Sequence, residues 1–387
     1  MTLYGGYLFY ICLIFALLPA IALGVLQKPL RFYTLGISIG FICMVLADDI
    51  QQFLCFIGFF LAELALIKGY QRIRIRYGRN EKLYYGAVLL SILPLVLNKC
   101  SPIFDWNIMG ILGISYLTFR TVQMIIEMYD GIITEVPVLE YSGFILFFPA
   151  LSCGPIDRSR RFHEDWVKVY GREEYLEMAG TGIYKILLGL IYKLILAVQF
   201  YKWMGFFDGS QWYCAIGYAY LYGFYLFFDF AGYSLMAVGT SYILGIRTPD
   251  NFRKPFAAKD MRDFWDRWHI TLSYWFRDFI FSRFIMKCVK KKWFHTRLQR
   301  ASAGFMVNMF IMGMWHGLTP SYLLYGLYHG MLLALTEIYQ KKSSFYKKNK
   351  DKRAYKLASW FVTLQLVMFG FLIFSGRLLE LLNVGGH

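Results

Sequence analysis

Long apolar runs alternate with short polar stretches along nearly the whole chain. Many runs approach the roughly twenty residues that an α-helix needs to cross a hydrocarbon core about 30 Å thick. The runs predicted to be membrane helices cover residues 4–26, 32–46, 52–67, 83–97, 108–126, 183–204, 213–230, 234–246, 301–318, 322–339 and 357–374. The pattern therefore predicts an all-α polytopic membrane protein with roughly ten or eleven transmembrane helices or half-spans. The runs 301–318 and 322–339 are joined by the turn Thr319-Pro320-Ser321, so they are predicted to form a helical hairpin.

Three segments do not fit simple spans. Residues 141–151 are apolar but too short to cross, and Gly154-Pro155 follows them, which favours a broken or re-entrant helix. Residues 158–177 are charged and amphipathic, which is typical of a helix lying along the membrane interface. Residues 247–283 are polar and rich in aromatic side chains, so they cannot form an ordinary membrane span.

Composition and charge narrow the class of protein. The 387 residues are 58% hydrophobic and only 17% charged, which excludes a soluble domain, a disordered chain and a disulfide-rich secreted scaffold. The net charge of +16 is concentrated in residues 68–82, 287–300 and 341–356, which the positive-inside rule places in the cytoplasm. This basic face suits anionic lipid headgroups or an acidic protein partner.

Common catalytic and metal-binding motifs are absent from the sequence. The seven cysteines are far apart and form no CxxC pair, so neither a disulfide framework nor a metal site is expected. The chain also lacks a Walker loop, an HExxH motif and a GxGxxG motif. We therefore expect no bound metal or cofactor, and the candidate chemistry falls to histidines.

His316 lies near the end of the apolar run 301–318. An ionisable side chain at membrane depth is costly, so it usually faces a cavity or a partner and is functional. Gly313 and Gly317 flank it on one helical face and would allow a second helix or a substrate to approach closely. The alternative is a histidine that only packs and forms a hydrogen bond between helices.

Two further histidines are candidates for the same cavity. His269 lies in the segment 263–278, which contains three tryptophans, three aspartates and two arginines. Such a segment suits the wall of a polar cavity, although an aromatic belt at the membrane interface has the same composition. For His329 a structural hydrogen bond is the preferred interpretation. One or two histidines at membrane depth favour acid–base catalysis on a substrate that reaches the protein within the membrane.

Five short blocks resemble the membrane-bound O-acyltransferase (MBOAT) family. They appear in that family's order and cover about residues 145–335 of this chain. The blocks are residues 148–158 (FPALSCGPIDR), 228–234 (FDFAGYS), 251–255 (NFRKP), 264–269 (FWDRWH) and 314–317 (MWHG). Within the family, residues 228–237 and 326–330 are most similar to the branch that transfers D-alanine to teichoic acids.

The resemblance implies a single membrane-embedded domain over residues 1–387, built around a central tunnel. It divides into N-terminal spans (1–130), a motif core (145–335), a basic cytoplasmic loop (341–356) and a last span with a tail (357–387). The family places its invariant histidine at His316, as general base, and a second histidine at His269. The roles left open for His269 are to orient His316 or to polarise the substrate carbonyl.

The resemblance also implies a reaction and its partners. D-alanine arrives as a phosphopantetheine thioester on an acidic carrier protein at the cytoplasmic face, and leaves as an ester on lipoteichoic acid outside the plasma membrane of a Gram-positive bacterium. A short single-span accessory protein is a possible partner. The apolar residues Phe284, Ile285, Met286 and Val289, beside a run of lysines, are candidates for carrier docking, with an interfacial helix resting on lipid as the alternative.

Several alternatives stay open from the sequence. Transfer is either direct or relayed through an acyl intermediate. A related enzyme would instead acetylate another exported polysaccharide, and a non-enzymatic alternative is a transporter or flippase in which His316 relays protons.

Overall fold

The computed structural model describes residues 3–104 and 110–382. Within these ranges the regular elements are helices and no strand is present, which confirms the predicted all-α class. The chain forms two compact units, one of residues 1–191 and 232–250 and the other of residues 192–231 and 251–387, and each is described by itself. The start of the predicted span 108–126 and the C-terminal residues 383–387 lie outside the described residues.

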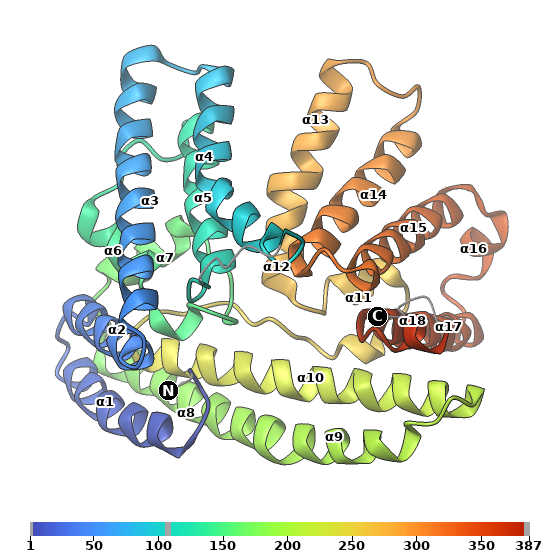
Figure 1. Cartoon of the computed structure of the whole chain (residues 1–387), viewed down its shortest axis with the longest axis horizontal. Coiled ribbons are helices and arrows are strands. Elements are labelled where there is room, and N and C mark those ends of the chain that lie inside the picture. Colours follow the sequence, from blue (N-terminus) through green and yellow to red (C-terminus); the bar gives the residue numbers. More distant parts are fainter. Residues whose placement is uncertain (1–2, 105–109, 383–387) are drawn as a thin grey trace. The chain divides into compact units, whose positions relative to one another are not determined.

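The first unit combines long apolar helices with the short helices α6 and α7 that follow α5 along the chain (Figure 1). Its helices are α1 (Tyr7–Val25), α2 (Arg31–Leu46), α3 (Ile50–Tyr77), α4 (Glu81–Cys100), α5 (Ile114–Asp130), α6 (Val138–Ile145), α7 (Ser159–Val167), α8 (Arg172–Leu190) and the end of α10 (Trp212–Ile243). Buried Arg120 donates hydrogen bonds to the carbonyl oxygens of Phe144, Ile145 and Ala150, at 2.8, 3.3 and 2.5 Å. These bonds satisfy two carbonyls at the end of α6 and one in the 3-10 helix Phe148–Ala150 that follows it, so the broken helix predicted at 141–151 is confirmed.

Three predicted boundaries in this part of the chain were wrong. Helix α3 continues past residue 67, the predicted end of its span, through most of the basic stretch that follows, and ends at Tyr77. The two apolar segments at 213–230 and 234–246 form one helix, α10. The helix continues through Gly232 because the backbone of that glycine packs closely against Gly189 of α8. The predicted interfacial helix 158–177 is interrupted at 168–171, and α7 buries Phe162 and Trp166 in protein.

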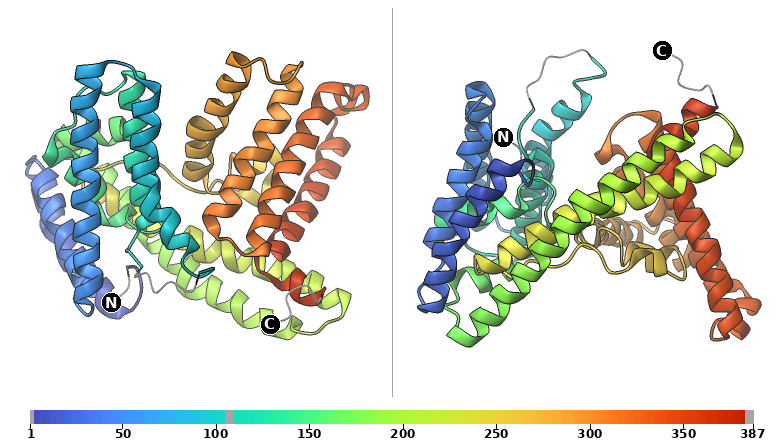
Figure 2. Two further views of the ribbon diagram at one scale, coloured as in Figure 1. Left: turned by 45° about the horizontal axis from the view of Figure 1, so that its top comes forward. Right: turned by 90° about the horizontal axis from the view of Figure 1, so that it is seen from below.

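The second unit carries the long helices of the C-terminal third. Its helices are α9 (Val198–Met204), the start of α10, α11 (Met261–Trp265), α12 (Ile270–Phe276), α13 (Ser282–Lys290), α14 (Arg297–His316), α15 (Pro320–Lys342), α16 (Ser344–Asn349), α17 (Arg353–Phe374) and α18 (Arg377–Leu381). The predicted hairpin of α14 and α15 is confirmed by the extensive contact between the two helices, which lie side by side in the left view of Figure 2. The polar segment 247–283 forms loops, α11, α12, a π-helical stretch at Arg277–Phe281 and the start of α13.

Among the described residues, six helical segments are long and apolar enough to cross a membrane. They are α1, α3, α4, α10, α17 and the continuous helix Arg172–Phe207 that includes α8 and α9. The protein is therefore a polytopic membrane protein, and the count of ten or eleven spans stays a prediction.

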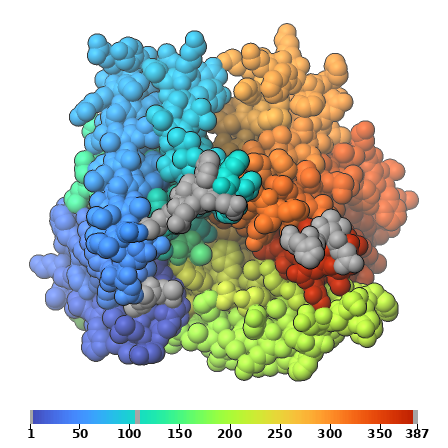
Figure 3. Space-filling model, in the orientation of Figure 1, coloured from blue at the N-terminus to red at the C-terminus, as the bar shows by residue number. Residues whose placement is uncertain are grey.

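The helices α14 and α15 pack backbone to backbone. A Cβ atom added at Gly313 would lie 2.5 Å from the carbonyl oxygen of Tyr322, and one added at Gly326 would lie 2.5 Å from that of Met309. Such distances leave no room for any side chain, so the two glycines set the spacing of the hairpin. In the space-filling view the side chains of this pair form one continuous surface (Figure 3).

Candidate active site

His316 is the last residue of α14. The helix begins at a capping box in which Thr296 and Gln299 satisfy each other's backbone N–H groups, and it ends where Gly317 turns to extended backbone. Pro320 then starts α15, because proline is favoured in the first turn of a helix. Since Gly313 lies one turn before His316, the close contact of α14 with α15 fixes the position of the imidazole.

His269 lies in the short connection between α11 and α12, in a left-handed backbone conformation with φ 43°. This conformation is costly for a residue other than glycine and is common at functional sites. Asn251 holds it in place: its side-chain Oδ1 faces His269 Nδ1 at 3.4 Å and accepts a hydrogen bond from the Thr271 hydroxyl at 2.5 Å. The backbone carbonyl of Asn251 also accepts from the N–H of Ile270 at 2.9 Å.

The two histidines line one small cavity, the histidine cavity. Its volume is about 50 Å³, and its walls include Phe230 from α10, Trp265 from α11 and Phe374 from α17. Phe230 contacts the edge of His269 with ring centroids 4.7 Å apart, and Phe374 contacts His316 at 5.0 Å. A space this small holds a reacting group and not the whole of a substrate, because pockets for drug-sized ligands measure about 300–1,000 Å³.

Burial controls the charge state of His269. The side chain is 4% exposed, and burial lowers the pKa of His269 to about 3, with a smaller contribution from His316. His269 is therefore neutral at physiological pH. Because Asn251 Oδ1 is an acceptor, it favours the tautomer with the proton on Nδ1, which leaves the lone pair on Nε2.

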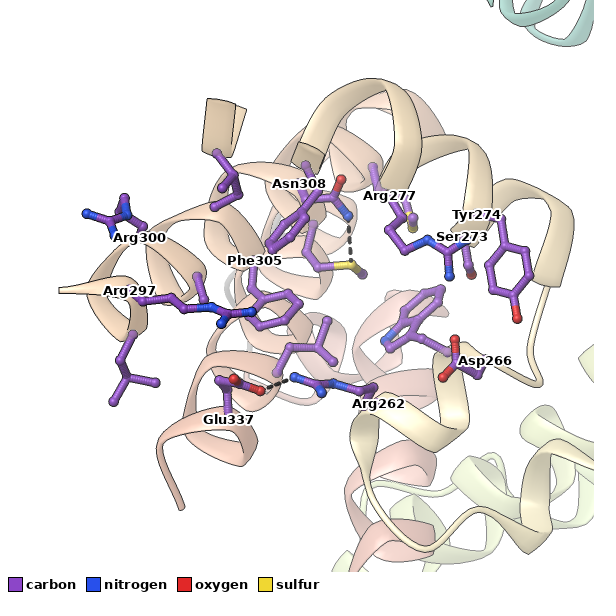
Figure 4. A pocket seen from close by; sticks show the side chains of 18 of the residues that line it. Arg262, Asp266, Ser273, Tyr274, Arg277, Arg297, Arg300, Phe305, Asn308 and Glu337 are labelled. Atoms are coloured by element: carbon purple, nitrogen blue, oxygen red, sulfur yellow. Dashed lines mark hydrogen bonds and ion pairs between the residues drawn. The ribbon is translucent and has the colours of Figure 1, made fainter. Parts of the chain in front are cut away.

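A much larger cavity, the arginine cavity, shares a wall with this site. Its volume is about 770 Å³, and Trp265 lines both cavities. The cations that line it are Arg262, Arg277, Arg297, Arg300 and Lys341. In Figure 4, Arg297 and Arg300 lie on one side of the cavity, while Arg262 forms an ion pair with Glu337. The cavity therefore suits a ligand with an anionic group at one end.

Two buried polar atoms line the arginine cavity without a partner among the described residues. They are the side-chain oxygen of Asn308, a residue 8% exposed, and the indole N–H of Trp265, which is 7% exposed. Unsatisfied polar groups are costly inside a protein, and each one calls for an explanation. One acceptor and one donor in a ligand-sized cavity match a ligand that carries amide groups.

The structure brings together only part of the predicted set. His316 and His269 meet as predicted, but His329 lies outside the histidine cavity. The structural hydrogen bond expected of His329 was wrong, because both of its ring nitrogens lack a partner among the described residues. Its ring packs against Tyr325 and Trp265, at centroid distances of 4.5 and 5.3 Å.

The four candidate docking residues lie on α13, and their side chains differ in how far they are exposed to solvent. Met286 and Val289 are 55% and 58% exposed, whereas Ile285 lines the arginine cavity. Phe284 is half-buried. Met286 and Val289 thus form an apolar surface beside the arginine cavity, flanked by Lys287 and Lys290.

Sequence reasoning missed two residues of the site, Asn251 and Trp265. Both lie inside sequence blocks that were singled out, at 251–255 and 264–269, but the sequence alone does not show that Asn251 supports His269. That relation depends on the pairing of residues 251–253 with 267–270, which includes a hydrogen bond from the N–H of Arg253 to the carbonyl of Arg267 at 3.0 Å.

The structure is that of a polytopic membrane protein with two histidines in one buried cavity, and comparison with known proteins shows its family. Residues 87–376 match the model of the MBOAT, membrane-bound O-acyltransferase, family. The chain belongs to this family, so it is an acyltransferase, and the transporter alternative is set aside. The match extends on both sides of the core predicted at 145–335.

Several curated relatives align along nearly the whole chain. A teichoic acid D-alanyltransferase of Bacillus subtilis (strain 168) is 41% identical, over 97% of this chain and 98% of the relative. A protein of the same description from Lacticaseibacillus rhamnosus is 40% identical, over 96% of each chain. A probable alginate O-acetylase of Pseudomonas fluorescens is 29% identical, over 79% of this chain and 59% of the relative.

Proposed function

We propose that this chain transfers D-alanine from a phosphopantetheine thioester on an acidic carrier protein to hydroxyl groups of lipoteichoic acid, with His316 as general base. The observation that carries the proposal is the meeting of His316 and His269 in one cavity whose wall, at Trp265, also belongs to a cavity of ligand size. The near full-length relatives described as teichoic acid D-alanyltransferases support the acyl group and the acceptor class.

The arginine cavity supports the identity of the donor. A phosphopantetheine arm is anionic at its phosphodiester and carries two amides along its length. Arg297 and Arg300, on the first turn of α14, suit the phosphodiester, since one guanidinium group can donate hydrogen bonds to two phosphate oxygens. Asn308 and Trp265, with their unpartnered side-chain oxygen and N–H group, suit the amides.

Helix α14 connects the two ends of the reaction. At 1.5 Å per residue, Arg297 and His316 are separated by about 28 Å along the helix axis. That length is comparable to the thickness of a hydrocarbon core, about 30 Å. A carrier at the arginine end and a teichoic acid at the histidine end therefore reach the same site from opposite faces of the plasma membrane of a Gram-positive bacterium.

The chemical step is a transesterification. The hydroxyl oxygen of the acceptor attacks the thioester carbonyl carbon while His316 takes the hydroxyl proton. The tetrahedral intermediate collapses, the carbon–sulfur bond breaks, and the thiolate of the arm receives the proton from His316. An ester and a free thiol result, so no oxidant, metal or further co-substrate is required. If an acyl intermediate relays the group, the transfer takes place in two successive steps, and each step breaks one bond to the acyl carbon and forms another.

His269 suits the orienting role better than the polarising one. With its Nδ1 proton directed to Asn251, neutral His269 presents a lone pair at Nε2. That nitrogen accepts a hydrogen bond from His316 or from the acceptor hydroxyl, but it has no proton to donate to a carbonyl. His269 would thus fix the tautomer of His316 with the basic nitrogen facing the substrate.

Helix α13 is the proposed docking surface for the carrier. Exposed Met286 and Val289 offer an apolar contact, and the neighbouring Lys287 and Lys290 complement an acidic protein. The cavity that would receive the arm includes Ile285 of the same helix. A short single-span protein remains a proposed accessory partner.

The test is reconstitution in vesicles with the carrier loaded with D-alanine on the protein's basic side and lipoteichoic acid on the other. Ester-linked D-alanine on the polymer supports the proposal, and free D-alanine in place of the loaded carrier should give none. Acetyl transfer from a different donor, with no transfer of D-alanine, would retain the family but refute this donor and acyl group.

A further inference from the structure

The arginine cavity contains one acid, Asp266, that forms no ion pair or hydrogen bond through its carboxylate with any described residue. The other acid of the lining, Glu337, pairs with Arg262. Two neighbouring acids of the same segment are also paired, Asp263 with Arg267 at 2.7 Å and Asp278 with Arg277 at 3.1 Å. Asp266 thus differs from its neighbours in having no counter-ion among the described residues.

The environment of Asp266 is unfavourable for an unpaired charge. The residue is half-buried, and burial raises the pKa of its carboxyl against the opposing effect of Arg277. The groups that act on it electrostatically are Arg277, Asp263, Arg262 and Arg253. None of these cations is within ion-pair distance, so a cation supplied by a ligand would stabilise the ionised carboxylate of Asp266.

The position of Asp266 associates it with the reacting end of the ligand. It caps the C-terminus of α11, directly after Trp265, and lies three residues before His269. Because Trp265 lines both cavities, Asp266 is next to the residue where the arginine cavity meets the histidine cavity. Figure 4 places Asp266 on one side of the arginine cavity and Arg297 and Arg300 on the other.

The cavity therefore has a cationic end for an anion and a separate acid for a cation. An aminoacyl group on a phosphopantetheine arm has this charge pattern: the phosphodiester at one end is negative, and the α-ammonium beside the thioester is positive. A simple acyl group, such as acetyl or propionyl, has the same arm but lacks the ammonium.

We propose that Asp266 binds the ammonium of the acyl group and so selects aminoacyl donors over simple acyl donors. The inference rests on the proposed function and adds a specificity residue to it. A charge-assisted hydrogen bond formed only by the aminoacyl donor corresponds to a preference of about 10- to 100-fold. Asp266 would then act on the donor alone and not on the acceptor.

The experiment compares two donors that differ only in the amine: the carrier loaded with D-alanine and the carrier loaded with propionate. The full chain is reconstituted in vesicles with lipoteichoic acid, and kcat/KM is measured for each donor. Wild type should prefer the D-alanyl donor. Asp266→Asn should lower transfer of D-alanine about 10- to 100-fold and leave transfer of propionate unchanged, whereas Asp266→Glu should restore part of the preference.

A matched control removes the same charge elsewhere. Asp351→Asn, in the basic loop after α16, should leave both rates at the wild-type value. Equal losses for both donors in Asp266→Asn would show a structural role, and an unchanged rate with D-alanine would show no role. Either result overturns the inference. Wild type that uses neither loaded carrier would instead refute the proposed function, so the two failures are distinguishable.

Discussion

The contact between α14 and α15 at Gly313 makes the position of His316 testable without changing any chemical group of the site. An added Cβ atom at Gly313 would lie 2.5 Å from the carbonyl oxygen of Tyr322 and 3.1 Å from the Cα atom of Gly326. Ordinary contacts begin near 3.4 Å, so Gly313→Ala requires a shift of about 0.9 Å (3.4 minus 2.5) between two backbones. Because both neighbours are backbone atoms, no side-chain rotation relieves the contact.

The shift falls one helical turn before His316, so it moves the imidazole with it. A displacement of about 1 Å at a reacting group costs on the order of 100-fold in rate. Overpacking costs about 1–3 kcal/mol of stability, and the better helix propensity of alanine returns up to about 1 kcal/mol. We therefore expect Gly313→Ala to fold, to melt a few degrees lower, and to transfer acyl groups about 100-fold more slowly.

The assay is D-alanine transfer in vesicles, beside thermal unfolding in detergent. Gly69→Ala in α3 is the matched control, because no heavy atom lies within 4 Å of its added Cβ atom. That variant should keep wild-type transfer and wild-type stability or better. If Gly313→Ala transferred D-alanine at the wild-type rate, the account of how α15 positions His316 would be refuted.

Three further predictions follow from the same geometry. Asn251→Leu removes the side-chain oxygen that accepts a hydrogen bond from the buried hydroxyl of Thr271 and faces the ring of His269. We expect the free energy of unfolding to fall by about 1–3 kcal/mol and transfer to become slower. The control is Thr363→Val on α17, which removes another buried hydroxyl and should slow transfer little. Because burial lowers the pKa of His269 from 6.5 to about 3, between these two pH values the unfolded chain binds a proton that the folded chain does not. The free energy of unfolding should therefore fall by about 2 kcal/mol between pH 7 and pH 5. In thermal unfolding, His269→Asn should lose about 2 kcal/mol less than wild type over the same pH range. Met286→Asp on α13 should raise KM for the loaded carrier and leave transfer from a small pantetheine thioester unchanged; equal effects on both donors would place the defect in the cavity instead of the docking surface.

The sequence predicted the helical class and the hairpin because both follow from local patterns. Apolar runs of membrane length define α1 and α4, and the turn with Pro320 separates α14 from α15. The boundaries that were wrong depend on packing. The basic stretch after residue 67 extends α3 because lysine and arginine are good helix formers, and α10 stays continuous because its glycine contacts a glycine of α8.

The site was predictable only in its most unusual residues. His316 could be identified because an ionisable group in an apolar run is rare, and His269 because of its polar and aromatic surroundings. The support from Asn251 and the shared wall at Trp265 depend on which segments pair in space, and a single sequence does not encode that in any local pattern. His329 shows the reverse: its sequence context resembles that of a site residue, but the fold buries it among Tyr325 and other aromatic rings.

His316 is proposed as the base in transfer of D-alanine from the carrier to the polymer. The most direct test of this role is the reconstituted transfer assay on His316→Ala, beside His295→Ala as a control histidine in the exposed basic loop. We expect His316→Ala to fold, to bind the loaded carrier and to give no ester-linked D-alanine above background, while His295→Ala transfers at the wild-type rate. Transfer by His316→Ala at a rate close to wild type would contradict the assignment.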